Sequence, residues 1–157
     1  MLLLRPVSFF ENFHETLGLI KHEGINGNSI DPDLAVPMVA TRDIAEVAAK
    51  ALKARDWKGA VVRELLGPRD FSYSEATRII GERIGKPGLQ YVQSSYHDEA
   101  NALVQAGMSE SFAKLYVEMT RAFNEGTVKP RKRTPENTTP TRFEDFAGEL
   151  ARAYQAA

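Results

Sequence analysis

The apolar run Leu2-Leu3-Leu4, stopped by Arg5-Pro6, constrains the fold more than any other stretch of the chain. Three consecutive apolar residues without alternation indicate a strand covered on both faces, as in a parallel sheet. Pro6 ends the strand because proline has no N–H to donate, and the residue before it is biased toward extended geometry. Ligands of open parallel sheets lie just outside the carboxyl ends of the strands, so a functional site is expected directly after Pro6.

After Pro6 the sequence alternates helical and extended patterns, which is typical of an α/β fold. An apolar stripe at helical spacing over three turns comes first, formed by Phe10, Phe13, Leu17 and Ile20. The turn-rich residues 24–37 predict a loop, and short extended segments are expected at 38–40, 60–66 and 89–92. From residue 95 onward the pattern is purely helical. Asp43, Ser72 and Thr141 each precede a glutamate by three residues, so each is predicted to cap the start of a helix.

Composition excludes several classes of function. The 157 residues carry a net charge of −1 and no cysteine, so thiolate chemistry is excluded and no attraction to nucleic acid is indicated. His14, His22 and His97 are too scattered to predict a metal site. No segment approaches the ~20 apolar residues of a membrane span, so no membrane is expected as a partner and the cytoplasm is the expected location. The one basic run, 129–133, is interpreted as a solvated loop because no aromatic residue or helical face accompanies it.

Six short segments, in chain order, carry a resemblance to a known family: Leu4–Pro6, Phe9–Asn12, Thr41–Ala48, Leu66–Pro68, Ser72–Pro87 and Thr141–Phe146. Together they resemble the C-terminal half of the NmrA-like family, a branch of the atypical (extended) short-chain dehydrogenase/reductases with an NAD(P)-binding Rossmann fold. The resemblance implies an α/β fold: the last strands of a partial Rossmann-like parallel sheet, with a mainly helical substrate-lobe subdomain. Residues 1–23 and 38–67 would supply the Rossmann-derived elements and residues 68–157 the lobe, within a single C-terminal portion, 1–157.

Two motifs of dinucleotide-dependent reductases are absent from this sequence. The eleven glycines form no Gly-x-Gly-x-x-Gly turn after a strand, so the usual pyrophosphate loop is missing. The Tyr-x-x-x-Lys pair of classical reductases is missing too, because Tyr73 is followed four residues later by Thr77 and Tyr116 by Thr120. No catalytic residue is predicted. The resemblance implies NAD(P) in the parent family, but this chain alone is expected to bind it poorly.

The resemblance also implies where ligands would lie. The family segment that passes the nicotinamide end of the cofactor matches Pro6, Val7, Ser8 and Phe9. Positions on the substrate side of the cleft match Phe10 and Asn12. An alternative stays open, in which Phe9, Phe10 and Phe13 are core and Asn12 bonds to nearby backbone; for Phe10 the helical stripe favours the core.

Taken together, the resemblance implies an NAD(P)(H)-dependent reductase of a small carbonyl or quinone, or a redox sensor without turnover, with this chain inactive alone. The alternative is a non-catalytic, regulatory module that binds a ligand or a protein. A strand pair without neighbours leaves an unpaired edge and apolar surface in water. A homo-oligomer that covers Leu2–Leu4 and Val61–Leu65 is therefore expected.

Overall fold

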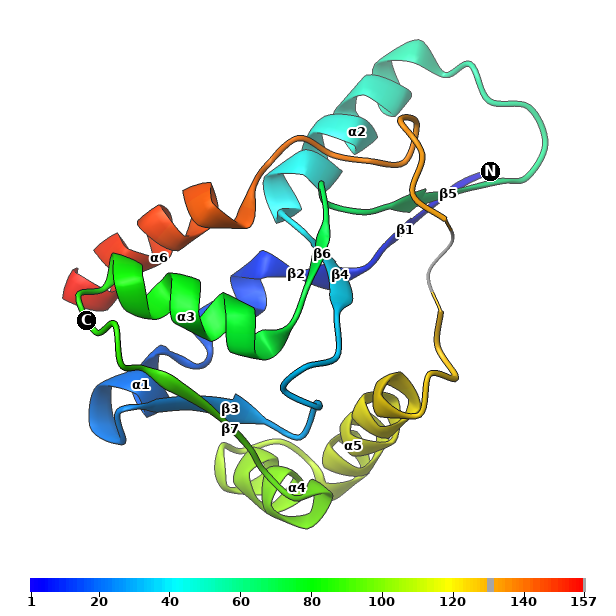
Figure 1. The fold of residues 1–157 in the computed structure, drawn as a ribbon. Coiled ribbons are helices and arrows are strands. Elements are labelled where there is room, and N and C mark those ends of the chain that lie inside the picture. The colour runs from blue at the N-terminus through cyan, green and yellow to red at the C-terminus, as the bar shows by residue number, and fades with distance from the viewer. Residues whose placement is uncertain (130–131, 157) are drawn as a thin grey trace.

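The computed structural model describes residues 1–129 and 132–156 and shows an α/β chain (Figure 1). Its elements follow in this order: β1 (Leu2–Pro6), β2 (Ser8–Phe9), the 3-10 helix η1 (Phe10–His14), α1 (Leu17–His22), β3 (Ile25–Asn28), β4 (Val36–Val39), α2 (Thr41–Ala54), β5 (Val61–Leu65), β6 (Asp70–Phe71), α3 (Tyr73–Arg83), β7 (Gln90–Gln93), α4 (Tyr96–Gln105), α5 (Glu110–Asn124) and α6 (Phe143–Ala156). Helices α3 and α6 lie side by side, whereas α4 and α5 lie together at the opposite end from α2 (Figure 1). No helix of the described residues is long and apolar enough to cross a bilayer.

The apolar run at the N-terminus forms the expected parallel strand. β1 pairs with β5, with Leu2 opposite Val61 and Pro6 opposite Leu65. Within this chain the strand is not covered on both faces as expected, because Leu2 and Leu4 are only partly buried and Leu3 is 42% exposed. A second, small sheet continues from the end of β1: β2 pairs in parallel with β4, and β4 pairs antiparallel with β6.

The prediction of a loop over residues 24–37 is wrong at its start. β3 lies there and pairs in parallel with β7. Its sequence Ile-Asn-Gly-Asn resembles a turn, but Gly27 serves a close approach between strands, because any Cβ there would collide with the carbonyl oxygen of Val92. The side chain of Asn26 is buried and donates a hydrogen bond to the Thr77 hydroxyl at 2.8 Å. Tertiary partners therefore made a strand from residues that favour turns.

The stripe of apolar residues after β2 is confirmed as core, although it does not form one helix. It is divided between η1 and α1, with Phe10 and Ile20 both fully buried. The ring centroid of Phe10 lies 5.2 Å from that of Phe143, in the edge-to-face geometry that aromatic pairs prefer, and 5.6 Å from that of Phe146, whose ring is tilted by 42°. The core thus joins the first helical turn of the chain to its last helix.

Of the three predicted helix caps, only Ser72 is confirmed: its Oγ accepts the N–H of Glu75 at 3.2 Å. Asp43 lies inside the first turn of α2, which begins at Thr41, and its carboxylate accepts both the N–H and the hydroxyl of Thr141, at 3.0 and 2.7 Å. Thr141 precedes the start of α6 by two residues, and its hydroxyl donates to Asp43 rather than capping α6. The N-terminus of α2 is capped by Glu11 instead, because both its carboxylate oxygens lie 3.0 Å from the backbone nitrogen of Thr41, the first residue of the helix.

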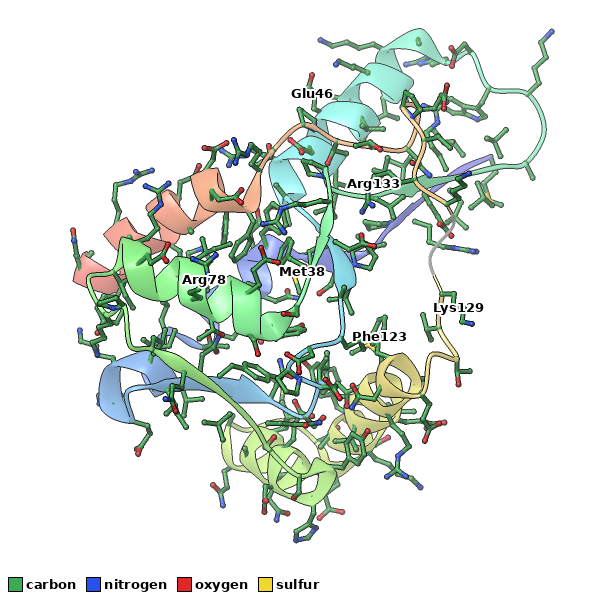
Figure 2. The ribbon with its side chains drawn as sticks, viewed as in Figure 1. Met38, Glu46, Arg78, Phe123, Lys129 and Arg133 are labelled. Atoms are coloured by element: carbon green, nitrogen blue, oxygen red, sulfur yellow. The ribbon has the colours of Figure 1, made fainter. Side chains whose placement is uncertain are left out.

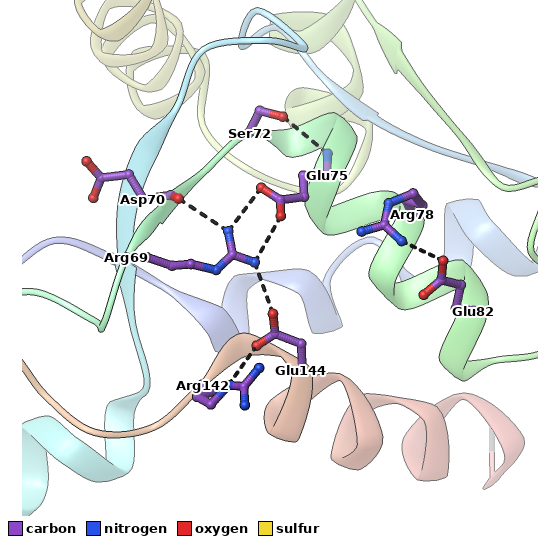
Figure 3. Close-up of polar contacts among 8 residues, drawn as sticks. All are labelled: Arg69, Asp70, Ser72, Glu75, Arg78, Glu82, Arg142 and Glu144. Carbon is purple, nitrogen blue, oxygen red and sulfur yellow. Dashed lines mark hydrogen bonds and ion pairs between the residues drawn. The ribbon is translucent and has the colours of Figure 1, made fainter.

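An ion-pair cluster fastens the start of α6 to the start of α3 (Figure 3). Nη2 of Arg69 lies 2.9 Å from Glu75 and 3.0 Å from Glu144. Burial by itself would raise the pKa of the Glu144 carboxyl, but hydrogen bonds from its own backbone N–H and from Arg69 outweigh it, so that pKa lies below its ordinary value. The cluster thus holds two helices that are 60 residues apart in the sequence against one another.

The basic run 129–133 is only partly the solvated loop that was predicted. Lys129 and Lys132 are exposed, while Pro130 and Arg131 lie outside the described residues. Arg133 is half-buried: its Nε donates to the carbonyl oxygen of Gly67 at 2.9 Å, and its guanidinium pairs with Asp70. This residue anchors the segment between α5 and α6 to the turn after β5 (Figure 2).

Candidate functional site

The segment predicted to pass a nicotinamide lies at the carboxyl ends of β1 and β5. Pro6 closes β1, and the N–H of Val7 still donates to the carbonyl oxygen of Leu65, the last residue of β5, at 3.3 Å. Ser8 and Phe9 then form β2 against β4. All four predicted residues, Pro6 to Phe9, are partly exposed. Their position is the one where open parallel sheets hold ligands.

The two residues predicted to face a substrate lie apart from one another. Phe10 is fully enclosed by aromatic rings, which gives it a clear structural role. Asn12, in η1, is exposed, and its carbonyl oxygen accepts the N–H of Glu15 at 3.2 Å. Contact of Phe10 and Asn12 with a substrate stays a prediction.

Tyr73 borders the same segment, and Tyr91 packs against Tyr73. Tyr73 opens α3, and its hydroxyl interacts with the side chains of Ser8 and Asn28. Burial raises the pKa of Tyr73, and these two polar neighbours only partly offset the effect. Its ring centroid lies 5.6 Å from that of Tyr91. Tyr73 therefore links the segment after β1 to the β3–β7 pair.

Tyr91 fixes the end of β3 through its hydroxyl. Its oxygen lies 2.7 Å from both Oδ1 of Asn28 and the carbonyl oxygen of Ile30, either of which can accept its single proton. Burial raises the pKa of Tyr91 as well, so both tyrosines are neutral hydrogen-bond donors at physiological pH. The neutral hydroxyls of these two tyrosines, beside their apolar rings, can orient a carbonyl oxygen by hydrogen bonding, but they supply no strong acid or nucleophile.

A buried polar network continues from β3 into α4 and α5. The carboxylate of Glu99 is buried and accepts a hydrogen bond from the hydroxyl of Ser29, which also lies 2.8 Å from the hydroxyl of Thr120. Nδ2 of Asn124 donates to the carbonyl oxygen of Ser29 at 2.9 Å and to the hydroxyl of Tyr96 at 2.8 Å. Both α4 and α5 are thereby tied to one short segment after β3.

Sequence reasoning missed these tyrosines and this network. Ser29 and Glu99 are 70 residues apart, and Ser29 and Thr120 are 91 apart, so no local pattern marks them. Only Tyr73 could have been found from the sequence, because it directly follows Ser72, the predicted cap of a helix.

The N-termini of four helices, α2 to α5, are already occupied by side chains of this chain, which leaves these four ill-suited to the phosphates of a dinucleotide. Such phosphates bind at free helix N-termini, but the carboxylate of Glu11 occupies that of α2, and serine hydroxyls occupy those of α3, α4 and α5. The glycines with positive φ all follow helices or lie in turns: Gly24, Gly59, Gly85, Gly107 and Gly126. In the described ranges no group of three or more His, Asp or Glu residues is placed to hold a metal ion. Contact of Pro6 to Phe9 with the nicotinamide end of a dinucleotide stays a prediction.

Comparison with known proteins gives a consistent result at the level of structure. No protein-family model and no curated protein matches the sequence. Among solved structures, an NADPH-dependent quinone oxidoreductase from Escherichia coli, complexed with NADPH, is similar with a TM-score of 0.76 and 20% identity over 95% of this chain and 53% of its own. The chain has a partial Rossmann-like fold. The likeness confirms the expected fold class and the resemblance seen in the sequence, at the level of the fold.

Two further structures share this Rossmann-like arrangement. The triphenylmethane reductase of Citrobacter sp. is similar with a TM-score of 0.73 and 20% identity, over 96% of this chain and 53% of its own. The negative transcriptional regulator NmrA, complexed with NADP, has a TM-score of 0.55 and 16% identity, over 94% of this chain and 47% of its own. The chain thus spans about half the length of the solved structures that it matches.

Proposed function

We propose that this chain is the substrate-side half of an NmrA-like, NAD(P)(H)-dependent reductase that acts on a small carbonyl or quinone. The observation that carries the proposal is the placement of Pro6 to Phe9 at the carboxyl ends of two parallel strands, with Tyr73 beside them. The fold likeness supports it, because the similar proteins include an NADPH-dependent quinone oxidoreductase and a triphenylmethane reductase. We expect the protein to act in the cytoplasm.

In this proposal a bound nicotinamide supplies hydride chemistry, and the chain supplies orientation. The backbone of Val7 to Phe9 positions the ring at the sheet edge. The neutral hydroxyls of Ser8 and Tyr73 orient the substrate oxygen, and the aromatic rings packed around Phe10 exclude water from one side. Because Glu11 and the serine caps fill the helix N-termini, the chain alone is proposed to bind dinucleotide weakly and to show no turnover.

Two ligands that separate the parts of the site test the proposal. Amide shifts of the ¹⁵N-labelled chain are measured during titration with nicotinamide mononucleotide, which lacks the adenosine half, and with menadione, a quinone. We expect changes centred on Val7 to Phe9 and on the α3 start near Tyr73. Ser111→Ala, an exposed position on α5, serves as a control variant and Ser8→Ala as the test variant. Shift changes scattered over the surface, or changes that Ser8→Ala leaves unaltered, would refute the proposed site. Oxidation of NADPH by the chain alone would refute the proposal that the chain is inactive by itself.

A second candidate function is a non-catalytic, regulatory module that binds a ligand or a protein. The likeness to a transcriptional regulator complexed with NADP favours it, as does the absence of a Tyr-x-x-x-Lys pair in the sequence. The same titration separates the two candidates. Response to nicotinamide mononucleotide without any response to menadione supports a sensor, and response to both supports a reductase.

The free edge of β1 carries a further proposal, that two copies of the chain associate. Leu3 is 42% exposed and Met1 75% exposed, beside backbone that an added strand could pair with. A dimer would cover Leu2–Leu4 and Val61–Leu65. Mass measurement in solution tests this: we expect a dimer or higher oligomer that Leu3→Lys converts to monomer, and a monomeric parent chain would contradict it.

A further inference from the structure

Glu99 of α4 carries a buried carboxylate whose charge no basic side chain balances. The residue is 8% exposed; it accepts a hydrogen bond from the hydroxyl of Ser29 and lies 3.5 Å from that of Thr120. Within residues 1–129 and 132–156, no lysine, arginine or histidine forms an ion pair with it. Arg121, next to Thr120 in α5, places its guanidinium carbon 4.6 Å from the ring centroid of Tyr96 instead. A carboxylate withdrawn from water in this way is stabilised by any positive charge brought near it.

Glu99 lies close behind the tyrosines of the candidate site. Ser29, which donates to Glu99, is the chain neighbour of Asn28, and Oδ1 of Asn28 lies 2.7 Å from the hydroxyl oxygen of Tyr91. The ring of Tyr91 in turn packs against that of Tyr73, with their centroids 5.6 Å apart. Two adjacent residues, Ser29 and Asn28, thus connect the buried carboxylate to the tyrosine pair.

The charge of Glu99 is felt by three tyrosines. Burial is the largest cause that raises the pKa values of Tyr73, Tyr91 and Tyr116, and the negative charge of Glu99 raises each of them further. Glu15 adds a second negative charge near Tyr116. The tyrosines themselves are neutral at physiological pH, and the face of a phenol ring is its negative side. Charge and rings together make surroundings that favour a cation.

A cationic hydride acceptor needs no acid, which is the group that the candidate site lacks. A neutral carbonyl that receives a hydride becomes an alkoxide and needs a proton, and the raised pKa values of Tyr73 and Tyr91 make both of them poor proton donors. A conjugated cation that receives a hydride forms one C–H bond and becomes a neutral molecule, without any proton. The electron pair of that bond comes from the dihydronicotinamide of the proposed function, which is oxidised to a pyridinium.

We propose that the candidate site prefers a flat, positively charged aromatic acceptor, such as an N-alkylated acridinium, over a neutral acceptor of the same size, and that Glu99 sets this preference. The place of binding rests on the proposed function, whereas the preference for positive charge rests on Glu99. Glu99 acts through its electric field rather than by contact. A unit charge ~10 Å away changes the affinity for a second unit charge by about tenfold at the effective dielectric constant of a protein.

Two ligands that differ by one hydride test the preference. N-methylacridinium is a cation, and N-methylacridan, formed from it by addition of a hydride, is neutral and of nearly the same size. Amide shifts of the ¹⁵N-labelled chain give the Kd of each ligand and show whether it binds at Val7 to Phe9. We expect the cation to bind about tenfold more tightly than the neutral ligand. Equal affinities, or tighter binding of N-methylacridan, would overturn the preference.

Glu99→Gln tests the residue, because glutamine keeps the size of the side chain and an acceptor oxygen for Ser29. We expect it to weaken binding of N-methylacridinium about tenfold and to leave binding of N-methylacridan unchanged. Glu118→Gln, which removes an exposed carboxylate of α5, is the matched control and should change neither Kd by more than about twofold. Equal effects of the two variants, or no effect of Glu99→Gln, would overturn the role of Glu99.

Salt dependence of the unmodified chain decides the matter if the Glu99 variant fails to fold. Salt screens a buried charge much less than exposed ones. A preference for the cation that persists from about 0.05 to about 0.5 M salt therefore supports the buried carboxylate, and a preference that salt abolishes overturns it.

The proposed function and this inference fail separately. If menadione shifts the amides of Val7 to Phe9 but the cation is not preferred, the proposed site stands and the inference is overturned. If the cation is preferred through Glu99 but shifts amides remote from Val7 to Phe9, the preference for charge stands and the proposed site is overturned.

Discussion

The contact between Asp43 and Thr141 offers the sharpest test of how this chain is held together. Asp43 is 4% exposed, and its carboxylate receives two hydrogen bonds, at 3.0 and 2.7 Å, from the residue that leads into α6. Hydrogen bonds to a charged group contribute ~1.5–3 kcal/mol, and an acidic side chain in the first turn of a helix adds ~0.3–1 kcal/mol. Asp43→Ala also leaves the N–H of Thr141 without its partner. We expect a loss of about 3 kcal/mol.

Two further variants separate the contributions of the two hydrogen bonds to this loss of stability. Asp43→Asn keeps an acceptor for one of the two bonds and should cost about 1 to 1.5 kcal/mol. Thr141→Val removes only the hydroxyl bond and should cost about 1 kcal/mol. In a double-mutant cycle, Asp43→Ala and Thr141→Val should couple by about 1 kcal/mol, because the second change removes nothing once the carboxylate is gone.

Urea unfolding, followed by circular dichroism, measures these free energies from the shift in midpoint at constant slope. Glu46→Ala is the control, since Glu46 is the residue that would matter if Asp43 closed a capping box. Glu46 is exposed, and its ion pair among the described residues is with Lys50 at 2.5 Å, so its loss should cost less than about 0.5 kcal/mol. Equal costs for Asp43→Ala and Glu46→Ala, or additive behaviour of Asp43 and Thr141, would refute the reasoning.

Three further outcomes are expected. Gly67→Ala should destabilise by about 1–3 kcal/mol in urea, because its Cβ would collide with the carbonyl oxygen of Met38 in β4; a neutral result would show that β4 can move aside. Ser72→Ala should cost about 1 kcal/mol by the same assay, and no loss would exclude the observed cap. Burial raises the pKa values of Tyr73, Tyr91 and Tyr116, so these tyrosines ionise first in the unfolded chain, near the ordinary value of 10.0. The free energy of unfolding should therefore keep their full contribution below that pH and fall as the pH rises above it. Replacing all three by phenylalanine should flatten that alkaline loss, and an unchanged pH profile would contradict it.

The sequence by itself determined the elements whose cause is local. The apolar run before Pro6 predicted a parallel strand, and β1 pairs in parallel with β5. The helical spacing from Phe10 to Ile20 predicted the core side of η1 and α1, and Ser72 capped its helix as predicted, because a cap needs only a partner three residues away.

Only the tertiary structure decided the contacts whose partners are distant in the chain. Asp43 has the right spacing for a cap but bonds to Thr141, 98 residues away, since a buried carboxylate gains more from two donors at the core than from its own helix end. β3 became a strand through the close approach of β7 at Gly27. Ser29 gained its place between α4 and α5 in the same way. Local patterns record backbone preference and burial, whereas the pairing of polar groups depends on which distant segments the core brings together.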